Sequence, residues 1–363
     1  TISIFAADLI FSISAIIFLI YLIKNSLRNI FKNIFFLIVI TFYFICVISS
    51  LFSNDILFSL KSSLPFLRAI LFIFLLSFII SHNQKSIDVF YNFFLITFSI
   101  LILHGIFEYI YQYYELIVTK TIHLSNVRLT LFFSEERKVG SFLVRLFGLF
   151  LALHIIKKDI SKFQNIFFLI LTFLSSIIIL LSGERNSLFF MIMFLFICLI
   201  LLDIKFKIKL TFVISIFVSF LILLSLNSNL SNRYIFDKNN KFNFSKDKII
   251  IFTPQHTAHY KTAIKMFFDK PYLGHGPKMF RILCADKKYN SEVTNEKNEI
   301  FSGCSNHPHS TYLQLLAETG ILGAFLFSTG FLYIVYKLTK HFFIILINRK
   351  KNLSDYQIIL SAT

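Results

Sequence analysis

The stretch QNIFFLILTFLSSIIILLS, residues 164–182, is followed after a four-residue turn by the equally apolar run SLFFMIMFLFICLILLD, residues 187–203. A bilayer core needs about 20 consecutive apolar residues per helix, and both runs approach that length. Lipid offers no partners for unpaired backbone groups, which restricts spanning segments to helices and closed barrels. Neither run alternates polar and apolar residues as barrel strands do. Two membrane helices joined by a tight turn are therefore predicted.

Runs of the same kind recur along the chain, at about 2–23, 34–53, 64–81, 89–109, 140–156, 209–226 and 316–336, and a tenth begins near Ser354. Hydrophobic residues make up 56% of the chain and charged residues 15%, against about 25% charged in soluble proteins. The fold class predicted is an all-α polytopic membrane protein with about nine complete transmembrane helices and the start of a tenth. Nucleic acid is excluded as a partner, because the basic residues are not gathered in a soluble domain.

The distribution of basic residues orients the chain in the bilayer. Connections that follow the odd-numbered runs carry fifteen Lys and Arg residues, whereas the short connections on the other side carry six. The positive-inside rule places the first set in the cytoplasm. The first run then passes from outside to inside, which predicts a further helix upstream of Thr1. The run lacks the basic start and small-residue cleavage site of a signal peptide.

One outer connection, residues 227–309, differs from the others in its length and polarity. It carries thirteen Lys and Arg residues against seven Asp and Glu, and polar loops of that length are uncommon unless they are functional. Two interpretations stay open: ordinary solvated charges, or a surface for an anionic ligand. The chain is thus divided into a bundle of eight spans (1–226), the long loop carrying the active site (227–309), and a C-terminal part (310–363). That last part holds a boundary helix, the ninth span, a basic loop and the start of a tenth span.

The loop ends in a histidine-rich turn, HPHS, that leads into the last complete span. Pro308 suits the first turn of a helix, with Ser305 or Asn306 as its cap. His309 is then predicted in that first turn, where the positive helix terminus disfavours imidazolium and leaves the neutral form that a general base needs. The alternative is a capping or surface histidine. His307, on the other side of the proline, favours the functional interpretation.

Several residues of the following helix extend this candidate site. Thr311, Gln314 and Glu318 are expected on one helix face, and an acid near the apolar zone is a functional candidate by default. Gly320 and Gly323 are expected at helix-packing positions, where small residues permit close approach.

Two cysteines of the long loop, Cys284 and Cys304, are expected to form a disulfide. They lie twenty residues apart in the sequence, on the outer side, in a compartment that permits disulfides. The bond is expected to hold the His307–His309 turn against Lys278–Arg281. Cys46 and Cys198 lie within apolar runs and are expected to be buried thiols.

Four segments of the chain resemble, in the same order, segments of the bacterial O-antigen ligase/O-antigen polymerase family. HPHSTYLQLLAETGILG (307–323) resembles the family's signature, in which a His-Asn pair is followed by Leu-Gln, Glu and two Gly. MFFDKPYLGHGPKMF (266–280) resembles its Pro, Gly-x-Gly and Phe segment. SGERNS (182–187) and RLTLFFSEERKVGSFL (128–143) are similar to two of its short outer loops. Of the four segments, residues 307–323 give the most specific resemblance.

The resemblance implies roles for individual residues. His309 matches the family's general base, and Arg185 matches an Arg that contacts a diphosphate. Arg suits this role because its planar fork binds phosphate oxygens bidentately; the alternative is an interfacial, snorkelling Arg. Ser310 stands where the family has Asn, and His256 stands where it has a second Arg. The substrate-binding residues predicted with these are His256, His259, Lys278, Arg281, His307, Arg128, Gln314 and Glu318.

The resemblance implies metal-independent, inverting glycan transfer, and no cofactor is expected. The expected partners are an undecaprenyl-diphosphate-linked glycan donor, an acceptor that is either lipid A-core or a growing O-chain, and the lipid bilayer. The expected location is the bacterial inner membrane, with the active site in the long periplasmic loop. The alternative from another class is a transporter or flippase of lipid-linked glycans, although no internal repeat supports it.

Overall fold

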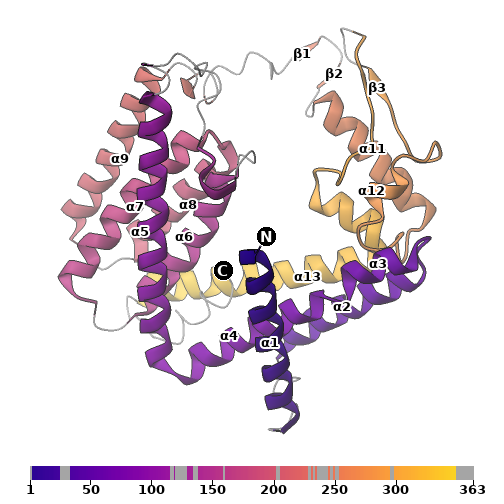
Figure 1. Ribbon diagram of the computed structural model, residues 1–363, viewed down its shortest axis with the longest axis horizontal. Coiled ribbons are helices and arrows are strands. Elements are labelled where there is room, and N and C mark those ends of the chain that lie inside the picture. Colours follow the sequence, from indigo (N-terminus) through magenta and orange to yellow (C-terminus); the bar gives the residue numbers. More distant parts are fainter. Residues whose placement is uncertain are drawn as a thin grey trace. The chain divides into compact units, whose positions relative to one another are not determined.

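A computed structural model describes residues 2–24, 33–114, 118, 129–133, 138–157, 160–201, 205–227, 230–231, 234, 244–245, 248–249, 253–294 and 298–348 (Figure 1). It divides into two compact units. The first comprises Thr1–Ile79 and Phe242–Lys340, and the second comprises Ile80–Lys241 and His341–Thr363. Each unit is described separately below.

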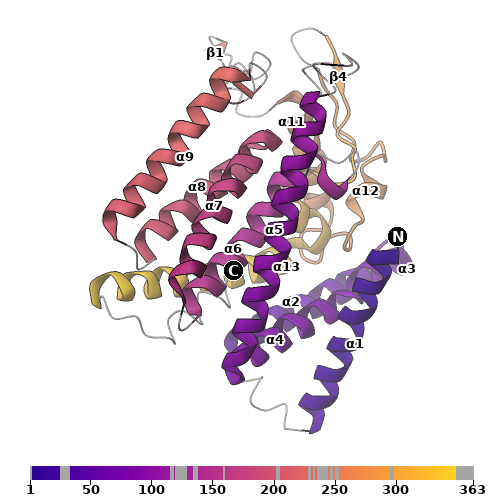
Figure 2. The same cartoon turned by 60° about the vertical axis from the view of Figure 1, so that its left-hand side comes forward.

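The second unit is a helix bundle. Its members are α5 (Gln84–Tyr114), α6 (Val139–Ile156), α7 (Lys162–Ser182), α8 (Arg185–Leu201) and α9 (Phe206–Leu226), with a short 3-10 helix at Leu131–Phe133. Figure 2 presents these helices side by side. The sequence marks the ends of α7: the side chain of Ser161 accepts a hydrogen bond from the backbone N–H of Gln164, and Gly183 follows in the left-handed conformation with φ 69°. Aromatic rings fill the core, which includes the fully buried side chains of Tyr91, Phe98, Phe147, Phe150 and Phe168.

The first unit combines apolar helices with most of the long loop. Its apolar helices are α1 (Ile2–Lys24), α2 (Ile34–Leu51), α3 (Ile56–Ser63), the greater part of α4 (Phe66–His82) and the greater part of α13 (Thr311–Asn348). The loop contributes α11 (Pro254–Asp269) and α12 (Phe280–Leu283). It also contributes two antiparallel strand pairs, β1 (Phe244–Ser245) with β2 (Lys248–Ile249) and β3 (Val293–Thr294) with β4 (Ile300–Phe301).

All nine predicted apolar runs lie on helices, so the chain is an all-α polytopic membrane protein. Seven helical segments among the described residues are long and apolar enough to cross a bilayer, and the segment Arg185–Ile200 is apolar but shorter. The third run begins earlier than predicted, because α3 precedes α4 with only Leu64 and Pro65 between them. The count of nine spans stays a prediction, and the tenth, near Ser354, lies outside the described residues.

The helix α13 is broken inside the first unit, and the break is a correction to the sequence interpretation. Gly320, expected at a helix-packing position, has φ 64° and ψ −167°, which is far from helical geometry. The bend that results separates a short first segment of α13 from the long one (Figure 1). A left-handed φ is accessible to glycine without steric cost, so Gly320 permits the break rather than close helix packing.

Candidate functional site

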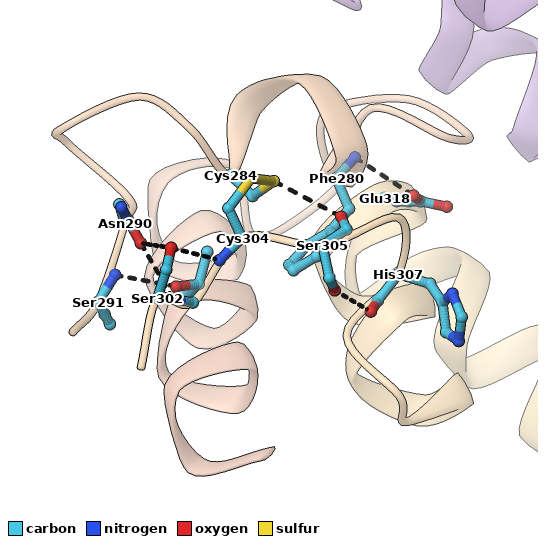
Figure 3. The surroundings of a disulfide bond; sticks show 11 residues. Phe280, Cys284, Asn290, Ser291, Ser302, Cys304, Ser305, His307 and Glu318 are labelled. Carbon is cyan, nitrogen blue, oxygen red and sulfur yellow. Dashed lines mark hydrogen bonds between the residues drawn. A yellow bond between two sulfur atoms is a disulfide. The ribbon is translucent and has the colours of Figure 1, made fainter. Parts of the chain in front are cut away.

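The long loop has a small core of its own, fastened by a disulfide. Ala263 and Met266 of α11 pack against Phe280 and Leu283 of α12. Cys284 and Cys304 form a disulfide with their Cα atoms 4.8 Å apart (Figure 3), which is the pairing predicted from the sequence. The chain around Cys304 is thereby attached to the end of α12.

The segment around Cys304 lies closely against α11. The backbone N–H of Gly303 donates to Asn290 Oδ1 at 3.1 Å. A Cβ atom at Gly303 would come within 2.7 Å of the carbonyl oxygen of Ala258 in α11. Ser305 Oγ donates to the carbonyl of His307 at 2.5 Å and so tightens the next turn (Figure 3). The consequence is that the HPH sequence is delivered to the N-terminal half of α11.

The sequence predicted His309 in the first turn of the following helix, but the structure places it before that helix. Helix α13 begins at Thr311, and His309 has a left-handed backbone with φ 55°. Ser310, rather than Ser305 or Asn306, starts the helix: its carbonyl accepts from the N–H of Gln314 at 2.9 Å. Left-handed backbone is uncommon for residues other than glycine, and when it occurs it often marks a functional site. The side chain of His309 is exposed.

Four histidines meet at this turn, and they are called the histidine cluster below: His256 and His259 from α11, with His307 and His309 from the loop. The ring centroid of His309 lies 4.3 Å from that of His307 and 5.3 Å from those of both His256 and His259. His256 and His259 are three residues apart on a helix and so share one face. The sequence named all four residues but could not bring the two pairs together.

The surroundings of His309 favour its neutral form. Its pKa is lowered first by burial, and then by the neighbouring imidazoles of His307, His259 and His256. The sequence predicted a neutral His309 from the charge of a helix terminus, which is a different cause. A neutral imidazole at neutral pH is the form that accepts a proton from a hydroxyl.

The segment PYLGHG, residues 271–276, pairs with the broken part of α13. The N–H groups of His275 and Gly276 donate to the carbonyls of Ala317 and Glu318 at 3.0 and 2.8 Å. In return, the N–H of Ile321 donates to the carbonyl of Pro271 at 2.8 Å. A helix break leaves backbone groups without partners, and buried groups of this kind must be satisfied elsewhere. The glycine-rich motif supplies those partners.

Serines of α2 and α3 attach the same segment to the apolar helices. Ser49 Oγ lies 2.5 Å from the carbonyl oxygen of Leu273 and 2.9 Å from that of Glu318. Ser59 Oγ donates to the carbonyl of Pro277 at 3.1 Å. Both serines are fully buried. Sequence reasoning missed them, because serine is common in apolar helices and nothing in the pattern marks these positions.

Glu318 and Gln314 hold the loop and α13 together. The Glu318 carboxylate is 6% exposed and accepts from the N–H of Phe280 at 3.3 Å (Figure 3) and from Gln314 Nε2 at 3.2 Å. Its oxygens are thus engaged by groups of the chain itself. These hydrogen bonds position the loop against α13, and the substrate contact predicted for both residues stays a prediction.

Lys278 and Arg281, predicted to bind substrate, lie just before and within α12. Lys278 is exposed and has a left-handed backbone with φ 63°, and Arg281 is exposed on α12. Both lie within six residues of Cys284, and the contact expected between this segment and the His307–His309 turn stays a prediction. Arg128, the remaining substrate-binding candidate, lies outside the described residues.

Arg185 begins α8 in the second unit, and the turn before it is fixed by a residue that sequence reasoning missed. Glu184 accepts hydrogen bonds from the N–H groups of Gly140 and Ser141, at 2.7 and 3.0 Å, and from Ser187 Oγ at 3.0 Å. A carboxylate that accepts the first N–H groups of α6 satisfies donors that have no partner within the helix. Arg185 itself is exposed at the start of its helix. The only sequence signal for Glu184 was its place in the short turn.

Asp269, a second polar residue that sequence reasoning missed, lies just before the PYLGHG segment. Asp269 accepts from Lys288 Nζ at 2.5 Å and from Tyr289 Oη at 2.6 Å, and these hydrogen bonds lower its pKa. The fully buried ring of His275 donates through Nε2 to the carbonyl of Met266 at 3.0 Å. Burial lowers the pKa of His275, so it is neutral at pH 7. In the sequence, His275 lies between Gly274 and Gly276, so it was assigned to the glycine motif and not considered as a polar side chain.

Comparison with known families gives one match. The model of the family described as O-antigen ligase matches residues 169–328, a range that contains Arg185, the α11 and α12 region and the first segments of α13. No curated protein and no solved structure matches the chain. Within the described part of the chain, no group of three or more His, Cys, Asp or Glu side chains is arranged to hold a metal ion. The segment from residue 169 to residue 328, somewhat less than half of the chain, is thus similar to the O-antigen ligase family.

Proposed function

We propose that this multi-pass membrane protein transfers a glycan from an undecaprenyl-diphosphate carrier to a sugar hydroxyl at the periplasmic face of the bacterial inner membrane. The family indicates glycan transfer of the ligase or polymerase type. The acceptor is lipid A-core for a ligase and the growing O-chain for a polymerase. The observation that carries the proposal is the turn at His309, where an exposed imidazole with a lowered pKa stands among three others.

The proposed reaction is a single displacement. The oxygen of the acceptor hydroxyl attacks the anomeric carbon of the donor, and its proton passes to the unprotonated ring nitrogen of His309. The bond between the anomeric carbon and the diphosphate oxygen breaks, and the diphosphate keeps the electron pair. Attack from the face opposite the leaving group inverts the configuration. Fixed positive charge near the diphosphate lowers the barrier, because negative charge develops there in the transition state.

The proposed cation for the diphosphate is Arg185, with His256, His259, His307, Lys278 and Arg281 as further contacts to substrate. Arg185 begins a helix directly after a turn fixed by Glu184, so its backbone is firmly placed. Arg128 is proposed as a further contact on the resemblance of its segment alone. Gln314 and Glu318 are proposed to act by holding the loop in place, as their hydrogen bonds suggest.

The lipopolysaccharide pattern of a deletion strain tests the function. If the gene encodes a ligase, the strain accumulates core without O-chain. If it encodes a polymerase, the strain carries core with a single repeat unit. Wild-type lipopolysaccharide after deletion contradicts both forms of the proposal. The same strain, complemented with variants, serves as the assay for single residues.

We expect Arg185→Ala to reduce glycan transfer by roughly 100-fold or more, the usual cost of removing one group that stabilises transition-state charge. If charge alone matters, Arg185→Lys recovers most of the activity; equal, large losses in both variants indicate the bidentate fork. Initial rates of transfer by purified protein measure the effect. Lys162→Ala, an exposed cation in the first turn of α7, is the matched control and should leave the rate unchanged. Normal transfer by Arg185→Ala would exclude the assigned role.

A further inference from the structure

The histidine cluster includes His256 in the first turn of α11, so several imidazole nitrogens lie close together beside the start of that helix. We propose that this group binds a phosphate-type oxyanion and takes up a proton when it does so. The inference rests on the proposed function, since the oxyanion would be the diphosphate of the donor or of the released carrier. It adds that the binding is linked to pH, which a site built from arginine alone would not be.

The unpartnered state of His259 is the first argument. Its side chain is 1% exposed, and neither ring nitrogen has a hydrogen-bond partner. One ring nitrogen of an imidazole always carries a proton, and a buried donor without an acceptor is unfavourable. The ring lies 5.3 Å from that of His309, so it faces the cluster. An oxygen of an oxyanion seated in the cluster would supply the acceptor that this ring requires.

The orientation of His256 is the second argument. Its Nδ1 lies 2.6 Å from Thr253 Oγ1, the cap of α11, which leaves Nε2 as the nitrogen available to a ligand. The ring is edge-on to that of His309, with centroids 5.3 Å apart. His256 also belongs to the first turn of a sixteen-residue helix, whose N-terminus carries partial positive charge and favours anions.

The balance of charge is the third argument. The titratable groups that face one another here are His256, His259 and Tyr260 on α11, with His307 and His309 on the loop. Among the described residues, no Asp or Glu forms an ion pair with any of these histidines. A proton added to the cluster therefore meets other imidazoles and no carboxylate within ion-pair distance among the described residues. An oxyanion supplies that counter-ion, because an opposite charge nearby stabilises the charged form of an imidazole.

The sign of the pH dependence follows from this linkage. An oxyanion raises the pKa of the imidazoles that it contacts, so it binds together with a proton and binds more tightly as pH falls. For each proton taken up on binding, the dissociation constant decreases by about tenfold per unit of falling pH, over the range where imidazole titrates. A fixed guanidinium in place of one imidazole removes part of this dependence, because it stays charged at every pH of the experiment.

Anion binding to the full chain in detergent tests the proposal, with sulfate and inorganic pyrophosphate as the probes. Sulfate keeps its charge across the pH range, so its dissociation constant reports protonation of the protein alone; pyrophosphate represents the diphosphate. Titration calorimetry at several pH values between about 5.5 and 8 gives the slope of the logarithm of the dissociation constant against pH. The variants are His256→Arg and His256→Asn, and the control is His82→Asn, an exposed histidine at the end of α4.

For the wild type and for His82→Asn, we expect the sulfate dissociation constant to rise by about tenfold per pH unit above pH 6.5. His256→Arg should bind more tightly than the wild type at pH 8 and with a shallower slope, whereas His256→Asn should bind more weakly at every pH. A slope that neither variant changes, binding independent of pH, or no binding of either anion overturns the proposal. The measurement involves no glycan, so anion binding can be absent while His309 and Arg185 are still essential for transfer. Conversely, pH-linked anion binding can be present while His309 and Arg185 are not required for transfer. The two proposals can therefore fail separately.

Discussion

Replacing His309 by alanine should reduce glycan transfer by about 100-fold to 10,000-fold, the usual contribution of a positioned general base. His309 is the central member of the histidine cluster, with the other three rings within 5.3 Å of its own. Its exposed side chain makes no contact on which the core of the loop depends. The variant should therefore keep its fold. Initial rates of transfer by the purified protein, with the complemented deletion strain as the second assay, measure the effect.

Two controls separate proton transfer from a loss of structure. The Cys284–Cys304 disulfide should stay closed in His309→Ala, as measured by the absence of new reactive thiols. Imidazole added to the buffer should restore part of the rate, because a free base can occupy the space left by the ring. His307→Ala, which removes the ring nearest to His309, should reduce the rate less. Wild-type transfer by His309→Ala would show that the base lies elsewhere.

The pH dependence of transfer by the wild type has a definite direction. Only neutral His309 accepts the proton, and burial together with the neighbouring imidazoles lowers its pKa. The rate should therefore increase as pH rises through this lowered pKa and be level at neutral pH. Oxyanion binding to the cluster strengthens in the opposite direction, so acid conditions should slow the chemical step while they favour binding of the diphosphate.

The sequence was sufficient for the helices and for the kind of chemistry expected in the loop. Lipid permits few structures, so nine apolar runs could be assigned to helices without any knowledge of packing. The partner of Cys284 was readable because Cys304 was the one other cysteine of the long loop. The roles of His309 and Arg185 came from a resemblance and stay predictions.

The arrangement of the site could not be read in the same way. His256 and His309 are separated by more than fifty residues, and only the packing of the loop onto α11 brings their rings together. The left-handed backbone at His309 could not be read from the sequence, because a positive φ is uncommon for every residue type other than glycine. Glu318 was taken for a substrate contact because its acidity stands out in an apolar run, whereas its partners, the N–H of Phe280 and the amide of Gln314, became visible only in the structure.

Gly320→Ala should strongly destabilise the fold of the first unit. At φ 64° an alanine is strained, at a cost of about 1 kcal/mol or more. Its Cβ would also clash with the carbonyl group of Tyr272. Relief of this clash would separate PYLGHG from α13 and break the hydrogen bond from Ile321 to Pro271. The carbonyls of Ala317 and Glu318 would also lose their hydrogen-bond donors. We therefore expect the free energy of unfolding to fall by roughly 3 kcal/mol or more.

The matched control lies in the same helix. Gly330 has ordinary helical geometry, and a Cβ there would come within 3.3 Å only of the Ile38 side chain, which can move slightly. Gly330→Ala should therefore leave stability nearly unchanged, while Gly320→Ala lowers the melting temperature in detergent by several degrees and exposes the loop to trypsin. Because PYLGHG also leads into the turn at Lys278 and α12, Gly320→Ala should reduce transfer as well, although no atom of Gly320 belongs to the histidine cluster. Equal melting temperatures for the two variants would mean that the break at Gly320 is not required, and that α13 can pass this point as a continuous helix.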